Sequence, residues 1–374
     1  MIIGLLKDVA PEQRVALLPE NVKHLVSRKT EFLVEKGAGA GAFAQDPDYE
    51  EAGAKVISRE EVIEQAGLLI QTSEPNGDLV NRLKPDQIWL SEYKPLWNRK
   101  LVKLFQTKGI TSFSMDSIPR ITRAQSMDVL SSMATVSGYK AVLAAASHLP
   151  TFFPMFMTAA GTIRPANVLI LGAGVAGLQA IAIARKLGAQ VEAFDVRSAV
   201  KEEVMSLGAR FVEVAGAKED TAAGGYAVEQ TEDYKRRQQE VINQHAAKAN
   251  VIIGTAQIPG KKAPVLISGE VVASMQPGSV IIDLATSSGG NCELAEDNKT
   301  VVKYGVTIVG QSNYPSQMPK DASKMFGKNV SNFTELLIAE DGSLRLDFND
   351  EIVKGTCITR EGQIYNERVK SIIS

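Results

Sequence analysis

The feature that most constrains this chain is a glycine-rich turn set between an apolar run and an apolar helix pattern. Residues 167–180 read NVLILGAGVAGLQA, so a buried-strand pattern leads directly into three glycines. Their spacing is typical of a dinucleotide-binding turn, because the first glycine permits the tight turn, the second admits a pyrophosphate and the third lets helix and strand pack closely. The phosphates then meet the positive end of the following helix. The residues expected to contact them are Gly172, Ala173, Gly174, Val175, Ala176 and Gly177.

An acidic residue follows where a ribose-binding acid is expected. Residues 190–195 read QVEAFD and indicate the next strand, which ends in Asp195 about 20 residues past the glycines. The negative charge of Asp195 repels a 2′-phosphate and therefore favours NAD over NADP. Arg197, which Val196 separates from the acid, can accept a phosphate, but holding the adenine end or pairing with Asp195 fits better. The alternative is an ordinary βαβ unit whose glycine-rich turn binds no ligand.

Two further segments are candidates for the nucleotide site, and each has a plainer interpretation. Thr255, Ala256 and Gln257 follow an expected strand at the carboxyl edge of the sheet, where ligands collect. The same three residues can form an ordinary strand-end turn. Gly225 and Tyr226 end a run of small and polar residues that can close over the nucleotide and exclude water, or can be a solvated loop.

Composition and charge bound the class of protein. A chain of 374 residues exceeds what one hydrophobic core normally serves, which predicts about two domains. A formal net charge of −2 gives no basic field, so neither nucleic acid nor an anionic membrane is expected as a ligand. Cys292 and Cys357 lie far apart, and no metal site is expected. No signal-peptide pattern or bilayer-spanning apolar run is recognised, so we expect a soluble, cytoplasmic chain without direct membrane insertion.

Alternating strand and helix patterns predict an α/β fold with two Rossmann-like, doubly wound domains and mostly parallel sheets. A long helix over residues 123–149 is expected to bridge them, and residues 355–365 indicate a hairpin. The nucleotide domain, residues 128–315, is then inserted into the first domain, residues 1–127 plus 316–374. Strands are expected at 2–6, 31–35, 68–71, 88–92 and 110–113 in the first domain, and at 167–171, 190–195, 211–214, 251–255, 280–284 and 306–309 in the second.

Polar side chains mark the start of the expected bridging helix. Gln125, Asp128 and Ser131 recur every third residue and are expected to share one helical face, with Arg120 before them. Burying an amide, a carboxylate and a hydroxyl costs free energy unless they meet a polar partner, and a nicotinamide carboxamide is such a partner. Helix capping with a solvent-facing stripe is the alternative. Arg120 can bind a phosphate or hold Asp128.

The supply of acid–base groups is small. The chain has three histidines, and each is expected to be structural because none belongs to a recognisable motif. Dehydrogenases that oxidise an alcohol or an amine need a group that handles the substrate proton. Hydride transfer between two nicotinamide rings needs only positioning and the exclusion of water. Polar orienting residues without a general base therefore favour that reaction.

Several segments resemble one family over nearly the whole chain. The more specific ones are RAQSMD at 123–128 and AGGY at 223–226. They accompany Lys7, EQRVA at 12–16, Pro19, MTAAGT at 157–162, the glycine turn, DVR at 195–197, IPG at 258–260 and GGNC at 289–292. With these segments the chain resembles the NAD(H)-binding alpha subunit of proton-translocating NAD(P) transhydrogenase, which is related to alanine dehydrogenase.

The resemblance implies a division of labour between subunits. This chain would hold NAD(H) and pass hydride to NADP⁺ on an NADP(H)-binding beta subunit, while separate membrane subunits translocate protons. It would form a homodimer and attach peripherally to the inner face of the membrane through its partners. At matching positions, the resemblance implies a nicotinamide site lined by Arg120, Gln125, Asp128 and Ser131, a ribose site at Asp195, and a mobile loop carrying Tyr226.

An alanine-dehydrogenase-like amino acid dehydrogenase is the main alternative. Such enzymes are expected to carry a catalytic Lys shortly before a Glu-Pro pair and a His at the end of the next strand. Here residues 70–75 read IQTSEP and residues 89–93 read WLSEY, so both groups are missing. Arg14 is common to both kinds of enzyme and does not discriminate. A third hypothesis is a non-catalytic NAD-sensing module, which would bind NADH without supporting hydride transfer.

Overall fold

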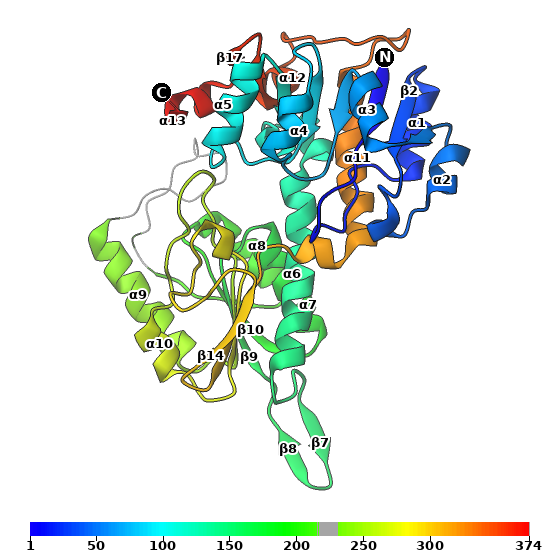
Figure 1. Cartoon of the computed structure of the whole chain (residues 1–374). Helices are drawn as coiled ribbons and strands as arrows, with labels where there is room; N and C mark the ends of the chain where they lie inside the picture. The colour runs from blue at the N-terminus through cyan, green and yellow to red at the C-terminus, as the bar shows by residue number, and fades with distance from the viewer. Residues whose placement is uncertain (215, 217–230, 374) are drawn as a thin grey trace. The chain divides into compact units, whose positions relative to one another are not determined.

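The computed structural model describes residues 1–214, 216 and 231–373, and it divides into two compact units (Figure 1). Unit 1 comprises Met1–Met133 and Pro315–Ser374, and unit 2 comprises Ala134–Tyr314. The chain thus builds most of unit 1, then all of unit 2, and returns to complete unit 1. Each unit is a mostly parallel α/β fold, as the sequence predicts.

Unit 1 is built on an eight-stranded sheet in the order β17-β16-β6-β5-β4-β1-β2-β3. Strands β1 to β6 pair in parallel, and β16 and β17 extend one edge in antiparallel fashion. Its strands are β1 (Ile2–Leu5), β2 (Glu31–Glu35), β3 (Lys55–Ile57), β4 (Leu68–Ile70), β5 (Ile88–Ser91), β6 (Thr111–Ser114), β16 (Cys357–Arg360) and β17 (Gln363–Ile364). Its α-helices are α1 (Pro19–Ser27), α2 (Asp46–Glu51), α3 (Arg59–Gln65), α4 (Gly77–Arg82), α5 (Arg99–Lys108), α11 (Pro319–Leu336), α12 (Glu351–Thr356) and α13 (Glu367–Ile373).

Unit 2 has a seven-stranded sheet in the order β11-β10-β9-β12-β13-β15-β14, parallel except for β14. Strand order reverses between β9 and β12, and in open α/β sheets ligands bind at the carboxyl ends of strands at such a point. Its strands are β7 (Phe156–Thr158), β8 (Gly161–Ile163), β9 (Asn167–Leu171), β10 (Gln190–Phe194), β11 (Arg210–Phe211), β12 (Val251–Gly254), β13 (Val280–Asp283), β14 (Lys299–Lys303) and β15 (Val306–Gly310). Its α-helices are α7 (Val175–Lys186), α8 (Lys201–Ser206), α9 (Glu232–Ala246) and α10 (Gly269–Ser274), with α6 (Val129–His148) shared between the units.

The central strands of unit 2 are apolar on both faces because helices cover both sides of a parallel sheet. Alternate residues of each strand enter two different cores. In β12, Val251 and Ile253 pack in one core, whereas Ile252 packs in the other. Ile281 and Ile282 of β13 divide in the same way. The two cores fix the strand ends, and with them the loops at the carboxyl edge.

The bridging helix begins later than the sequence predicts. The expected helix over residues 123–149 is a short 3₁₀ helix, η3 (Thr122–Met127), followed by α6. Gln125 therefore lies on η3 and Ser131 on α6, so the expected single helical face through these residues is wrong. Asp128 stands between the two helices in extended conformation, with ψ of 92°. The cause is the capping preference of Asp, which satisfies amides at a helix start better than inside a helix.

Most of the expected strands are confirmed within one residue. The strands β3 and β14, at sheet edges, were not expected, and neither were β7 and β8, which form a two-stranded sheet of their own. The strand expected over 211–214 is the two-residue β11. The expected hairpin is confirmed by β16 and β17, joined at Glu361 and Gly362, which both have positive φ as such turns require.

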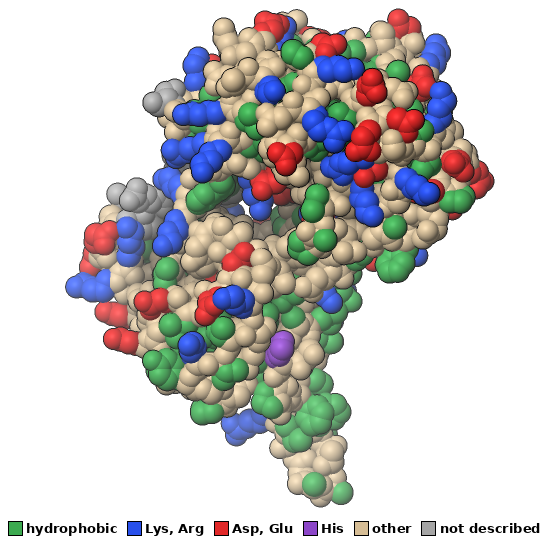
Figure 2. Space-filling model, viewed as in Figure 1, with side chains coloured by type: hydrophobic (Ala, Val, Ile, Leu, Met, Phe, Trp, Pro, Cys, Tyr) green, Lys and Arg blue, Asp and Glu red, His purple; other side chains and the backbone are tan. Residues whose placement is uncertain are grey.

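A two-stranded hairpin, β7–β8, projects from the rest of unit 2 (Figure 1). Figure 2 shows hydrophobic side chains at its surface, and the most exposed of these is Met157, at 75%. Of the described residues, α6 alone is long and apolar enough to cross a membrane by length and composition, with 39% of that stretch buried. A core helix of a water-soluble protein passes the same test.

Candidate functional site

The glycine turn of unit 2 joins β9 to α7 and is closely packed at two of its three glycines. Gly172 has φ of +100°, a conformation that side-chain-bearing residues rarely adopt. A Cβ at Gly177 would lie 1.9 Å from the carbonyl oxygen of Gly172, so the helix packs directly on the turn. Gly174 forms the N-cap of α7, and a Cβ there would meet nothing within 4 Å. Packing therefore requires Gly172 and Gly177, whereas the protein itself leaves open space at Gly174.

This difference predicts that an alanine at Gly177 destabilises the protein, whereas an alanine at Gly174 does not. Gly177→Ala is expected to lower the free energy of unfolding by about 3 kcal/mol, because the backbone of the turn must move. Gly174→Ala is the matched control and should change stability by less than about 0.5 kcal/mol. Denaturant unfolding of both variants measures this. Equal stabilities would show that the close approach at Gly177 does not exist.

Thr255 and Ala256 are tied to the glycine turn and to a second loop. The Thr255 hydroxyl donates to the carbonyl oxygen of Gly172 at 2.9 Å. The side-chain amide of Asn291 accepts from the Ala256 amide and donates to its carbonyl, both at 2.9 Å. Gln257 donates from Nε2 to the carbonyl of Leu284. These bonds fix the loop after β12 beside the loop after β9.

Asp283 supports this arrangement from the end of β13. Its buried carboxylate accepts from the backbone amides of Ala285, Asn291 and Cys292 at 2.7–2.9 Å. Burial raises the pKa of Asp283, and the three amides oppose that rise. Neither Asp283 nor Asn291 was assigned a role from the sequence. The GGNC segment was a signal for Asn291, but its partner Ala256 is 35 residues away and could not be inferred from spacing.

Asp195 lies directly beneath the glycine turn. Its Oδ2 accepts from the Ala173 amide at 2.7 Å, and its Oδ1 accepts from the Arg197 amide at 2.9 Å. The Arg197 guanidinium closes on the same carboxylate through Nε and Nη2, at 2.9 and 2.7 Å. Of the roles considered for Arg197, the structure shows the ion pair. Val196 between them packs partly buried against a core of unit 2.

Arg120, Gln125, Asp128 and Ser131 do not form a single polar stripe along one helix. Asp128 caps α6, because its Oδ1 accepts from the Ser131 amide at 3.0 Å and its Oδ2 from the Ser131 hydroxyl at 2.6 Å. Gln125 is exposed on η3, and Arg120 is exposed ahead of it. Helix capping, the alternative considered from the sequence, is therefore what the structure shows for Asp128 and Ser131. The side-chain amide of Gln125 remains exposed.

The segment that carries these residues is fixed from two sides within unit 1. Arg123 forms a bidentate ion pair with Asp350, the N-cap of α12, with both distances 2.7 Å. The side-chain amides of Asn329 and Asn332 on α11 both donate to the carbonyl oxygen of Ser126, at 2.8 and 3.0 Å. Both lone pairs of that carbonyl are used, which holds η3 in one orientation. Neither asparagine was identified from the sequence, since both lie about 200 residues from Ser126.

Gly225 and Tyr226 lie outside the described residues, so their expected role over the nucleotide stays a prediction. Among the residues that the structure describes, no group of three or more His, Cys, Asp or Glu side chains is arranged to hold a metal ion.

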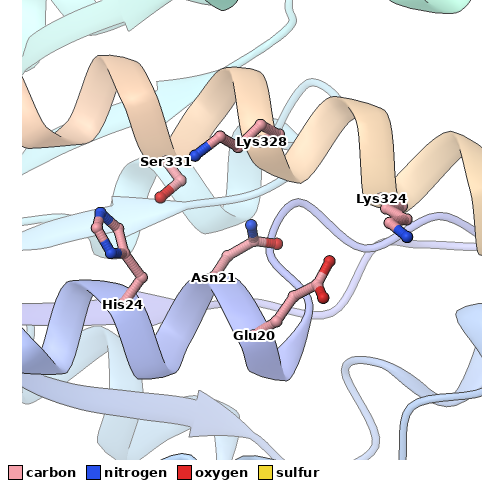
Figure 3. Close-up of a pocket in the computed structure, with 6 residues that line it drawn as sticks. All are labelled: Glu20, Asn21, His24, Lys324, Lys328 and Ser331. Atoms are coloured by element: carbon pink, nitrogen blue, oxygen red, sulfur yellow. The ribbon is translucent and has the colours of Figure 1, made fainter.

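Two pockets lined mainly by polar side chains lie in the described part of unit 1. One, of about 420 Å³, includes Arg14, whose guanidinium is held by Glu12 through bonds of 2.8 and 2.9 Å. The other, of about 300 Å³, lies between α1 and α11 (Figure 3). Its lining residues come from both helices and are Glu20, Asn21, His24, Lys324, Lys328 and Ser331. Neither pocket contains a residue proposed for the nucleotide.

Comparison with known proteins identifies the family. The profile described as "Alanine dehydrogenase/PNT, N-terminal domain" matches residues 4–137, and the corresponding "C-terminal domain" profile matches residues 141–367. The chain is 46% identical to an alpha subunit of the NAD(P) transhydrogenase of Rhodospirillum rubrum, with 97% of each chain covered. It is 28% identical to the alanine dehydrogenase of Mycobacterium tuberculosis, over 96% of this chain and 92% of that one.

A solved structure agrees with these matches. The crystal structure of transhydrogenase from Sinorhizobium meliloti superposes with a TM-score of 0.88 and 40% identity, covering 97% of this chain and 100% of that chain. The chain belongs to the alanine dehydrogenase/PNT family of pyridine-nucleotide-dependent oxidoreductases, in which its sequence groups with the alpha subunits of NAD(P) transhydrogenase.

Proposed function

We propose that this chain is the NAD(H)-binding subunit of a proton-translocating NAD(P) transhydrogenase and passes hydride between NADH and NADP⁺ held by a partner subunit. The observation that carries the proposal is the turn after β9, which combines open space at Gly174 with a carboxylate, Asp195, at the end of β10. The identity of 46% to a transhydrogenase alpha subunit supports it.

The residues of unit 2 fit a dinucleotide. The amides of the first turn of α7 have no partner within the helix and suit the pyrophosphate. Gly174 allows the phosphates to approach the backbone, because no side chain intervenes. Asp195 binds the adenosine ribose, and its charge favours NAD(H) over NADP(H). Thr255 to Gln257 contribute from the end of β12, where strand order reverses.

The role of unit 1 is to orient the nicotinamide. Bound NADH supplies the hydride, and the reaction requires no proton to be taken from a substrate. Arg120, Gln125, Asp128 and Ser131 then act as positioning groups for the ring and its carboxamide. Because the cap bonds of Asp128 and Ser131 hold the start of α6, the exposed amide of Gln125 is the group best able to contact the carboxamide.

The structure weighs against the alternative of an amino acid dehydrogenase. The pocket that contains Arg14 would have to bind a substrate carboxylate, and Glu12 holds two donors of that guanidinium, but this pair does not discriminate because Arg14 is common to both kinds of enzyme. Lys7, just after β1, lines this pocket, but the segment before Glu74 and Pro75, where the alternative expects the catalytic lysine, carries Thr72 and Ser73. We expect no NADH oxidation with pyruvate and ammonia under conditions in which NADH binding saturates. Turnover with these substrates would establish the alternative.

We further propose a homodimer that uses the β7–β8 hairpin. An isolated two-stranded hairpin is marginally stable in water, so its apolar side chains require a covering surface. A second copy of the chain is the occupant most consistent with hairpin residues that are 40–75% exposed, including Phe156, Met157 and Ile163. The partners beyond the dimer are the NADP(H)-binding beta subunit and the membrane subunits, which hold this chain at the inner face of the membrane.

The dimer predicts a specific effect of charge in the hairpin. Met157→Asp is expected to shift the particle from dimer to monomer, because a carboxylate would be buried without a partner. Val302→Asp on β14, where the valine is 65% exposed, is the matched control and should stay dimeric. Light scattering after gel filtration gives the masses. A dimeric Met157→Asp protein, or a monomeric parent, would contradict this assembly.

A further inference from the structure

The carboxylate of Asp195 is fully occupied before any nucleotide arrives. A carboxylate offers about four acceptor positions, two on each oxygen. Oδ1 accepts from the amide and Nε of Arg197, and Oδ2 accepts from the amide of Ala173 and Nη2 of Arg197. The side chain of Asp195 is only 6% exposed. A ribose hydroxyl therefore cannot reach this acid unless one of these donors leaves.

The four donors differ in how easily they leave. Two are the backbone amides of Ala173 and Arg197, which are held in place by the main chain. The other two belong to the guanidinium of Arg197, at the end of a flexible side chain that is 27% exposed. This side chain can rotate toward solvent without disturbing the backbone. The hydrogen bonds to Asp195 raise the pKa of Arg197. The guanidinium also stays charged after it leaves Asp195, because arginine is protonated at any ordinary pH.

From this geometry we propose that Arg197 is a gate on the ribose site: it occupies the Asp195 carboxylate in the empty protein and must be displaced before the ribose hydroxyls of NAD(H) can bind. This inference rests on the proposed function, because it takes Asp195 as the ribose acid. The backbone amides of Ala173 and Arg197 stay in place and hold the carboxylate for the ligand. Part of the binding free energy is thus used to break a bidentate ion pair.

Displacement also gives Arg197 a role in selectivity. Once released, the guanidinium remains tethered two residues from Asp195, next to the ribose. A 2′-phosphate would lie near both groups, repelled by Asp195 and attracted by Arg197. Arg197 therefore weakens NADH binding through competition and partly compensates the repulsion of NADPH. Removing it should widen the preference for NADH.

The test is the dissociation constant of each nucleotide, measured by calorimetry at fixed ionic strength, for the parent chain, Arg197→Met and Arg197→Lys. Arg197→Met is expected to bind NADH about three- to tenfold more tightly and NADPH no more tightly. Arg197→Lys keeps the charge without the planar fork, so its NADH affinity should lie between the other two. In an Asp195→Asn background, Arg197→Met should give no such gain, because the ion pair is already lost.

The outcomes separate this inference from the proposed function. If the parent chain binds NADH and Arg197→Met binds it equally or more weakly, the gate is wrong and the proposed function stands. If tightening appears equally in the Asp195→Asn background, Arg197 does not act through Asp195, and the gate is again wrong. If the parent binds neither nucleotide, the proposed function fails and the gate fails with it.

Discussion

Replacing Asp195 with alanine is expected to weaken NADH binding about ten- to hundredfold. The reason is the loss of charge-assisted hydrogen bonds to the ribose, each contributing on the order of 1.5–3 kcal/mol. The variant also leaves the Ala173 amide without its 2.7 Å partner, so the glycine turn loses a support. Because the negative charge is removed, NADPH binding should weaken less than NADH binding, and the preference between the two should narrow. Titration with both nucleotides measures this ratio.

Asp195→Asn is the control that separates charge from hydrogen bonding. The asparagine keeps an oxygen that can accept from the Ala173 amide, so the turn should stay in place and thermal unfolding should change little. It removes the charge, so the preference for NADH should still narrow. If Asp195→Ala and the parent chain show the same ratio of NADH to NADPH affinity, Asp195 does not bind the ribose.

Gln125→Asn is expected to slow hydride transfer about 100-fold, and Asp128→Asn is also expected to slow it, while both leave NADH affinity within a few-fold of the parent. A shift of about 1 Å in a positioning group is enough for such a loss of rate. In Gln125→Asn the amide is withdrawn by one methylene. In Asp128→Asn the charge is lost, but asparagine caps helices as well as aspartate does, so α6 should remain intact. Single-turnover kinetics separate the transfer step from binding.

The matched control for these variants is a cap substitution elsewhere in unit 1. Asn76 caps α4 through a bond of 2.8 Å to the Leu79 amide, and Asn76→Asp should retain the parental rate. A parental transfer rate in Gln125→Asn would remove Gln125 from the nicotinamide site. Loss of NADH affinity in proportion to the loss of rate would assign it to ground-state binding rather than to positioning.

The strands of the sheets were predictable from the sequence because each one is marked by the pattern of its own residues. Val251–Gly254 and Val280–Asp283 each begin with three consecutive β-branched apolar residues, as is typical of parallel strands buried on both faces. The glycine turn was predictable because the backbone conformation of Gly172 and the close packing at Gly177 exclude side chains there. Edge strands such as β14 gave no comparable signal, since polar residues face solvent along most of their length.

The supports of the site were not predictable, because they depend on contacts between distant segments. Nothing in the spacing of Asn329 and Asn332 indicates that both bind the carbonyl of Ser126. A three-residue spacing also cannot distinguish a 3₁₀ turn from an α-helix, which is why the start of α6 was placed too early. Arg197 was recognised as a possible partner of Asp195, but only the structure shows that it occupies both carboxylate oxygens.

The most direct test of the proposed function is the reduction of acetylpyridine adenine dinucleotide, an NAD analogue, by NADPH. The assay contains a purified NADP(H)-binding transhydrogenase component, with and without this chain. We expect turnover only when the chain is present, at a rate that rises with its concentration until the partner is saturated. Tight NADH binding without any transfer to a compatible partner would contradict the account and would support the sensing module or the amino acid dehydrogenase instead.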